Sequence, residues 1–167
     1  MPGRKYAFFI LFAALSLGLD QWTKVLARHE LRPRGPLRPL IVVEGYFDLR
    51  YGENPGGAFS TLRDFPGGRP LLALLAVAAL VLVFFYLRKA PAAVARLPVA
   101  LGLLAGGAAG NLADRVLYGR VTDFIVWKVG RREWPAFNIA DAALCAGVGL
   151  VVLHIIPTRP EAPPSRD

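Results

Sequence analysis

The hydrophobic residues of this chain gather in four long blocks that carry almost no charge, at residues 6–19, 71–87, 97–112 and 137–156. A helix rises about 1.5 Å per residue, so each block covers much or all of the ~30 Å hydrocarbon thickness of a bilayer. The charged residues lie between the blocks. The pattern therefore predicts a mainly α integral membrane protein with four transmembrane helices.

The first block follows a short basic N-terminus, a combination that also occurs in cleavable signal peptides. No small-x-small cleavage site follows it, however, and the chain becomes apolar again at Val25 and Leu26 after the polar run DQWTK. We therefore favour a spanning helix of roughly twenty residues over a signal peptide. In this helix we expect Trp22 at the level of the lipid headgroups and Lys24 snorkelling toward water.

The segment at residues 28–69 has a different character. Arg and Pro dominate residues 32–39, which predicts an irregular, hydrated stretch. Residues 47–51 then alternate between apolar and polar side chains, as in a half-buried strand, and a turn at NPGG follows. We expect a small β-strand cradle outside the membrane.

The polar side chains near the helix ends fall at one face of the membrane. Four spans place both chain ends at one face, so the first and third helices end, and the second and fourth begin, at the other. The polar residues placed at that second face are Asp20, Asn54, Asn111, Asp114, Arg115, Asp123, Asn138 and Asp141. Ionisable groups beside hydrocarbon are costly, so these residues are candidates for function. We expect one membrane-embedded domain at residues 1–157, including the segment at 28–69, and a disordered cytoplasmic tail at 158–167.

The basic residues do not settle which face is cytoplasmic. Seven Lys and Arg lie at the termini and in the loop after the second block, and the other thirteen of the twenty lie on the face of the polar cluster. By number that face would be cytoplasmic. Its basic residues are spread over longer segments, however, and long segments follow the positive-inside rule weakly. Charge alone leaves the orientation open.

Composition narrows the class of function. A net charge of +8 favours contact with anionic lipid headgroups, whereas the basic residues form no patch with interleaved aromatics, so no nucleic acid partner is expected. The single cysteine, Cys145, cannot form an intrachain disulfide, and His29 and His154 are far apart. No Cys/His group has metal-ligand spacing, so we expect no metal and no other cofactor.

Asp123 and Asp141 are the strongest candidates for chemistry. Each is a lone carboxylate in an apolar setting at the membrane boundary, and the polar, basic hairpin between them lets the chain fold back and bring them together. Two carboxylates in a poorly solvated site cannot easily both ionise, so they share one proton. The ionised carboxylate would deprotonate a water, and the protonated one would donate a hydrogen bond to the scissile carbonyl.

Structural roles compete with this hypothesis. The aspartates could cap helices or pair with Arg115 or Lys24, and for Asp114 we favour a bracing network with Asn111 and Arg115. Among other nucleophiles, Ser60 has no Lys or His near it in sequence, and Cys145 is expected to serve packing.

Two functions other than hydrolysis also stay open. A proton-coupled transporter would use the aspartates as a relay, but it predicts carboxylates at several membrane depths, and the blocks are free of charge between their ends. A scaffold could associate through Gly102, Gly106 and Gly110, which we interpret as a helix-packing ridge, but it leaves the pair of aspartates unexplained.

Five segments, taken together and in order, resemble the lipoprotein signal peptidases (signal peptidase II), the membrane aspartic peptidases of bacteria. They are LDQWTK at 19–24, NPGGAFS at 54–60, GNLADR at 110–115, VTDFI at 121–125 and FNIAD at 137–141. The resemblance covers nearly the whole chain apart from the tail. Pro55 departs from it by stiffening a turn expected to touch substrate, and the Arg/Pro-rich stretch at 32–39 has no functional account.

The resemblance implies a role for each matching residue. Asp123 and Asp141 match the catalytic pair; Asn54, Asn111, Arg115 and Asn138 match polar residues lining the site; and Asp20, Lys24 and Asp114 match supporting positions. It implies an endopeptidase that cuts diacylglyceryl-modified prolipoproteins just before the lipidated cysteine, needs no metal and is inhibited by globomycin. It also implies a multi-pass protein of the bacterial inner membrane, in contact with membrane lipids and expected to be monomeric. Both termini would be cytoplasmic, and the aspartates would lie near the outer leaflet.

Overall fold

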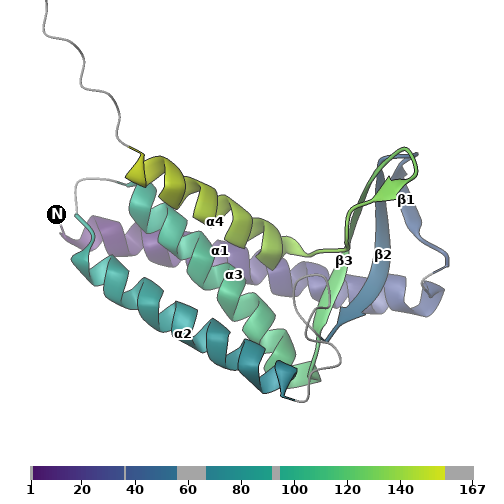
Figure 1. Cartoon of the computed structure of the whole chain (residues 1–167), viewed down its shortest axis with the longest axis horizontal. Helices are drawn as coiled ribbons and strands as arrows, with labels where there is room; N and C mark the ends of the chain where they lie inside the picture. The colour runs from purple at the N-terminus through teal and green to yellow at the C-terminus, as the bar shows by residue number, and fades with distance from the viewer. Residues whose placement is uncertain (1, 36, 56–66, 92–94, 157–167) are drawn as a thin grey trace, which may run out of the picture.

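Four helices and a small antiparallel sheet form the part of the chain that the computed structural model describes, residues 2–35, 37–55, 67–91 and 95–156. The helices are α1 (Pro2–Leu26), α2 (Gly68–Lys89), α3 (Arg96–Tyr118) and α4 (Ile139–Ile155). The N-terminus of α1 and the last turn of α4 lie at the same end of the helices, and the sheet lies at the other (Figure 1). The predicted mainly helical fold with a small sheet is therefore confirmed.

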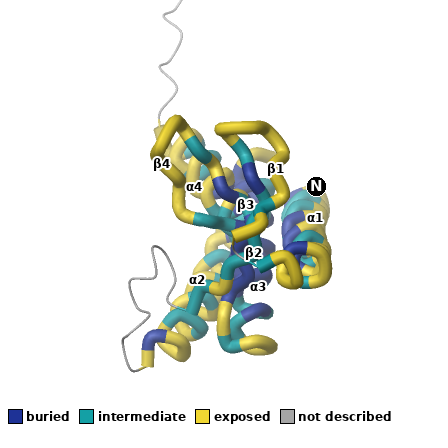
Figure 2. The backbone as a smooth tube through the Cα atoms, turned by 90° about the vertical axis from the view of Figure 1, so that its right-hand side faces the viewer, coloured by how far each residue is buried: buried dark blue, intermediate teal, exposed yellow. Residues whose placement is uncertain are grey.

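The outer surfaces of the helices are apolar. Three of them, namely α1 with its extension, α2 and α3, are long and apolar enough to cross a membrane, and α4, at 17 residues, reaches the lower end of the spanning range. Most of α2 is exposed or half-buried, whereas α3 packs against α1, α2 and α4 and contains most of the buried helical residues (Figure 2). Exposed apolar helix faces of this length are suited to contact with lipid.

The glycine ridge of α3 allows α1 to approach it closely. A Cβ added at Gly102 would lie 2.6 Å from the carbonyl oxygen of Phe9 in α1, and Gly106 faces α1 in the same way. Gly110 continues the ridge and lies against the carboxylate of Asp20. The predicted packing ridge is therefore confirmed, and its last glycine leaves room for a polar side chain.

The four-stranded sheet has the order β1-β2-β3-β4, in which all neighbours are antiparallel. The strands are β1 (Leu40–Val43), β2 (Phe47–Asn54), β3 (Val121–Val129) and β4 (Arg132–Glu133). The predicted strand at 47–51 is confirmed as part of β2. The strand nature of β3 was missed because its first four residues are all buried, so the strand lacks the alternation that identifies a half-buried strand.

The first helix is longer than the sequence predicts. It continues from Leu26 through a π-helical turn, η1 (Ala27–Leu31), into a 3₁₀ helix, η2 (Arg32–Arg34). The expectation of irregular structure is therefore wrong for Arg32–Arg34. The extension forms because Ala27 and Leu31 are buried against Phe124 of the sheet, and Gly35 then ends it at a φ of 73°. Two other segments with predictions, residues 56–60 with Ser60 and the tail at 158–167, lie outside the described residues.

Candidate active site

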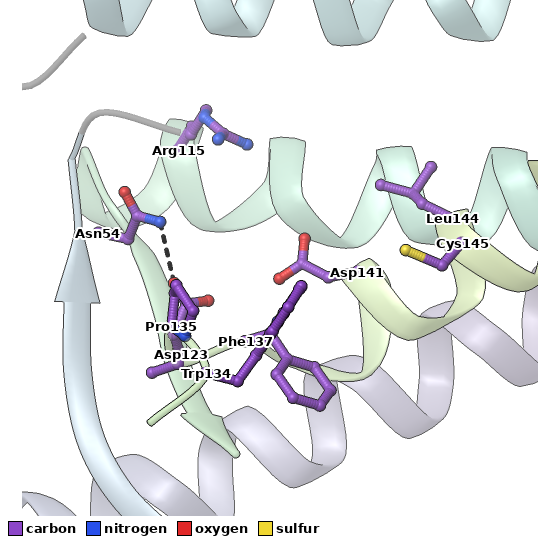
Figure 3. Close-up of a pocket in the computed structure, with 10 residues that line it drawn as sticks. Asn54, Arg115, Asp123, Trp134, Pro135, Phe137, Asp141, Leu144 and Cys145 are labelled. Carbon is purple, nitrogen blue, oxygen red and sulfur yellow. Dashed lines mark hydrogen bonds between the residues drawn. The ribbon is translucent and has the colours of Figure 1, made fainter. Parts of the chain in front are cut away.

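A cavity of about 290 Å³ lies where the sheet meets α3 and the start of α4. Four of the predicted site residues line it, namely Asn54, Arg115, Asp123 and Asp141. The remaining lining residues are Trp134, Pro135, Ala136, Phe137, Leu144 and Cys145. Figure 3 shows these side chains, which come from β2, α3, β3, the segment between β4 and α4, and the first turns of α4. The fold thus joins two carboxylates that are distant in sequence in one partly apolar cavity.

Asp123 is positioned by the pairing of β3 on both sides. In the register with β2 it lies opposite Gly52, where an added Cβ would lie 3.3 Å from the Asp123 carbonyl oxygen. On the other side, the backbone N–H groups of Phe124 and Ile125 both donate to the carbonyl oxygen of Phe137, at 3.0 and 2.9 Å. These bonds hold β3 beside the segment that leads into α4.

Asp141 lies in the first turn of α4, where it forms a capping box with Asn138. The backbone N–H of Asp141 donates to Asn138 Oδ1 at 3.0 Å, and the backbone N–H of Asn138 donates to Asp141 Oδ2 at 3.2 Å. The alternative that Asp141 caps a helix is therefore confirmed, and the same carboxylate also lines the cavity.

A chain of side-chain amides connects the two carboxylates. Asn138 Nδ2 donates to Asp123 Oδ1 at 2.7 Å and to Asn111 Oδ1 at 3.1 Å. Asn111 Nδ2 in turn donates to Asp141 Oδ1 at 2.8 Å. The second oxygen of Asp123 accepts a bond from Asn54 Nδ2 at 3.0 Å, drawn as the dashed line in Figure 3. Both carboxylates are thus held by N–H donors in fixed positions.

The surroundings of Asp123 raise its pKa toward neutrality. Burial raises the pKa of Asp123 to about 6, and the charge of Asp141 acts in the same direction. The amide donors Asn54 and Asn138 and the charge of Lys24 oppose this rise. A carboxyl group with this pKa is suited to giving and taking protons near neutrality.

A buried ion cluster supports the amide chain from behind. Lys24 is fully buried, with its amino group 2.8 Å from Asp20 Oδ2, 3.6 Å from Asp114 Oδ2 and 2.9 Å from Asn111 Oδ1. The prediction that Lys24 snorkels to water is therefore wrong, because the two carboxylates satisfy its charge inside the protein. Since an ammonium group can only donate, the Asn111 atom facing it is the oxygen, which leaves Nδ2 for Asp141.

The cluster also includes a residue that the sequence did not single out. Arg28 binds Asp114 Oδ1 at 2.6 Å and Thr122 Oγ1 at 3.0 Å, while the backbone N–H of Thr122 donates to Asp114 Oδ2 at 2.9 Å. Asp114 thus holds Thr122, the residue before Asp123, and also pairs with Arg28 and Lys24. We had expected Asp114 to form a network with Asn111 and Arg115 instead. Arg115 itself donates to the Asn111 carbonyl oxygen at 3.1 Å.

Cys145 was expected to serve packing, but its position does not match that role. It is exposed and lines the cavity one helical turn beyond Asp141. Within the described part of the chain, no group of three or more His, Cys, Asp or Glu side chains is arranged to hold a metal ion.

Comparisons with known proteins give matches over most of the chain. The family model of signal peptidase (SPase) II matches residues 12–157. A lipoprotein signal peptidase of Geobacter metallireducens is 41% identical over 97% of this chain and 97% of its own length, and one of Teredinibacter turnerae is 45% identical over 84% and 82%. Among solved structures, a bacterial membrane enzyme determined by the in meso method is similar with a TM-score of 0.80 and 27% identity, over 93% of this chain and 94% of that one.

Proposed function

The chain belongs to the signal peptidase II family, and from that premise we propose that Asp123 and Asp141 are the catalytic pair with which it removes signal peptides from prolipoproteins. One observation above all supports these roles. Both carboxylates line one cavity, and the amides of Asn138 and Asn111 link them. The pair would work as an aspartic endopeptidase.

The environments of the two carboxylates support different roles. Asp141 lies in the first turn of α4, where its carboxylate lines the cavity, and it acts as the base. Asp123, whose pKa burial raises to about 6, carries the shared proton, and exclusion of water by bound substrate raises this pKa further.

In the first step Asp141 takes a proton from a water molecule, whose oxygen attacks the scissile carbonyl carbon. Asp123 donates a hydrogen bond to the carbonyl oxygen and stabilises the tetrahedral intermediate. The proton held by Asp141 then passes to the leaving nitrogen as the C–N bond breaks. Asn111 and Asn138 keep the two carboxylates in place throughout, because each donates to one of them.

The lining of the cavity supports a lipidated substrate. Leu144 and Cys145 extend the wall from Asp141 along α4, and Phe137 and Trp134 add aromatic surface beside it. A peptide bond at the carboxylates would thus lie next to an apolar wall that faces the membrane. We infer that the bond cut is the one just before a cysteine that carries diacylglycerol.

Several further properties belong to the same proposal. We propose a bacterial inner-membrane protein that acts as a monomer, with both termini in the cytoplasm, the cavity near the outer leaflet and globomycin-type peptides as inhibitors. The position of the sheet, opposite the N-terminus of α1 and the last turn of α4, supports this arrangement (Figure 1). We also propose that residues 1–157 act as one domain.

Cleavage of a diacylglyceryl-modified prolipoprotein by the purified protein in detergent tests this function. Wild type should cut before the lipidated cysteine with or without a chelator, and Asp123→Asn and Asp141→Asn should each be folded and inactive. Asp48→Asn is a matched control, because Asp48 is a buried carboxylate of the same sheet that pairs with Lys128 outside the cavity.

Two outcomes would overturn the proposal. Wild type that leaves lipidated substrate intact would contradict the peptidase function for this chain. If wild type cuts but both Asn variants also cut, the function stands and the catalytic pair is wrong. Loss of cutting in a folded Asp48→Asn variant would show that the assay reports general damage to the sheet.

A further inference from the structure

A second cavity, of about 250 Å³, lies between the extended first helix and the sheet. Its lining is almost wholly apolar and consists of Thr23, Leu26, Ala27, Glu30, Leu31, Leu40, Leu49 and Phe124. Asp123 and Phe124 are neighbours in β3, so their side chains point to opposite faces of the strand. This cavity therefore contacts the back of the strand that carries Asp123 and is distinct from the candidate active site.

The cavity continues the lipid-facing surface of α1. Leu15, Leu19, Trp22 and Leu26 are all exposed and follow each other at intervals of three or four residues, so they form one stripe along the helix. Leu26, the last of them, also lines the cavity. The hydroxyl of Thr23 donates to the Leu19 carbonyl oxygen at 2.7 Å, so it is satisfied within the helix. An acyl chain can thus pass from the stripe into the cavity without contact with an unsatisfied polar group.

In the chain, three exposed arginines follow the lining residues that the extended first helix contributes to the cavity. They are Arg32, Arg34 and Arg38, and they belong to the Arg/Pro-rich stretch at 32–39 that had no functional account. Arg34 Nε donates to the carbonyl oxygen of Glu30 at 3.2 Å, which holds the guanidinium beside a residue of the lining. The Arg32 guanidinium lies 5.9 Å from the ring centroid of Tyr51. The one acidic residue of the lining, Glu30, binds His29 Nδ1 at 2.8 Å.

The position of this basic group matches the depth of lipid headgroups. The first helical segment is 32 residues long, about 48 Å at ~1.5 Å per residue, whereas the hydrocarbon layer is ~30 Å thick. Its last turns therefore extend past the hydrocarbon. One guanidinium group can donate to two oxygens of the same phosphate. Anionic lipids also attract basic side chains that lie at the level of the headgroups.

We propose that this cavity binds one acyl chain of an anionic phospholipid whose phosphate is held by Arg32 and Arg34. A volume of about 250 Å³ is below the usual range for a whole drug-sized ligand, which fits part of one chain and not a complete lipid. The lipid would fasten the end of the first helix to the sheet behind Asp123. The site needs no role of Asp123 or Asp141, so it stands or falls separately from the peptidase proposal.

Native mass spectrometry of the full chain, taken from nanodiscs of phosphatidylcholine mixed with phosphatidylglycerol, tests the proposal. Wild type should retain phosphatidylglycerol in preference to phosphatidylcholine. Replacing Arg32 and Arg34 together with Gln should lower this preference about thirtyfold. Leu40→Trp, which fills the cavity and keeps both arginines, should reduce the retention of either lipid.

Arg131→Gln/Arg132→Gln is the matched control, because it removes the same charge from exposed positions of the β3–β4 hairpin. It should keep the preference of wild type. The proposal is wrong if wild type retains both lipids equally, or if the control loses as much preference as the Arg32/Arg34 pair, which would mean binding by general surface charge. It is also wrong if folded Leu40→Trp, checked by circular dichroism and elution volume, retains phosphatidylglycerol as wild type does.

Discussion

Replacing Lys24 with Met tests whether the buried ion cluster stabilises the fold. The amino group of Lys24 contacts Asp20 at 2.8 Å and Asp114 at 3.6 Å, and all three side chains are fully buried. Met has a similar length and no charge, so the variant leaves two buried carboxylates with one cation fewer. Asp114 still binds Arg28 at 2.6 Å, so the loss falls mainly on Asp20.

The magnitude follows from what Asp20 keeps. Removal of one partner from a buried ion pair costs about 3–5 kcal/mol. Asp20 still accepts bonds from the backbone N–H of Ala140 at 2.9 Å and from Gln21 Nε2 at 3.0 Å. We therefore expect a decrease of about 3 kcal/mol in the free energy of unfolding, which is roughly 100-fold in the unfolding equilibrium. Equilibrium unfolding by SDS in mixed micelles measures it.

A second substitution separates the lost cation from lost packing. Asp20→Asn removes the unpaired charge, so Lys24→Met/Asp20→Asn should recover at least half of the lost stability. Lys89→Met is the control, because Lys89 is exposed at the end of α2, and it should unfold as wild type does. The reasoning fails if Lys24→Met is as stable as wild type, or if Asp20→Asn adds to the loss instead of relieving it.

Three further predictions concern protonation, helix packing and access to the cavity. Asn54→Ala removes a hydrogen-bond donor from Asp123. A hydrogen bond to an ionised group is worth about 1.5–3 kcal/mol, so the pKa of Asp123 should rise from about 6 by roughly one to two units. The limb of the kcat/KM pH profile that reports Asp123 should then move to higher pH, and an unmoved limb would contradict the assignment. Gly106→Ala places a Cβ against Ser16 of α1 and should lower the stability by about 1–3 kcal/mol in thermal unfolding, whereas Gly149→Ala, with open space around it, should not. A neutral thiol reagent should slow cleavage by wild type through Cys145, and Cys145→Ala, whatever its own rate, should not respond to it.

The helices could be predicted from the sequence because burial in lipid depends on a local property, a long run without charge. The sheet was predicted only in part. The alternation at 47–51 reports a strand with one wet face, whereas β1 is exposed along its whole length and the start of β3 is buried on both faces. Neither pattern has period two, so these strands become evident only through their pairing with β2.

The polar site, like the sheet, was predicted only in part from the sequence. The motifs identified four polar or charged residues that line the cavity, Asn54, Arg115, Asp123 and Asp141. The burial of Lys24, in contrast, depends on α3, where Gly110 leaves space for Asp20 beside the helix. Arg28 follows Asp20 and Lys24 at the same four-residue spacing, which is a usable signal for one helix face. It was missed because the first helix was expected to end before Arg28, and the packing of Ala27 and Leu31 on the sheet carries the helix further.

Asn111 makes the stability of the fold and the geometry of the proposed chemistry depend on each other. Its Oδ1 accepts from Lys24 and Asn138, and its Nδ2 donates to Asp141, so one amide belongs to both the ion cluster and the catalytic chain. An Asp at this position could not donate to Asp141, and a Leu could bond to neither side. Loss of Lys24 removes one of the two donors that fix the orientation of this amide, so the partner of Asp141 is held less firmly even in molecules that remain folded. The activity of Lys24→Met per folded molecule should therefore fall. In a double-mutant cycle on kcat, the effects of substituting Lys24 and Asn111 should be strongly non-additive, because both substitutions break the same connection.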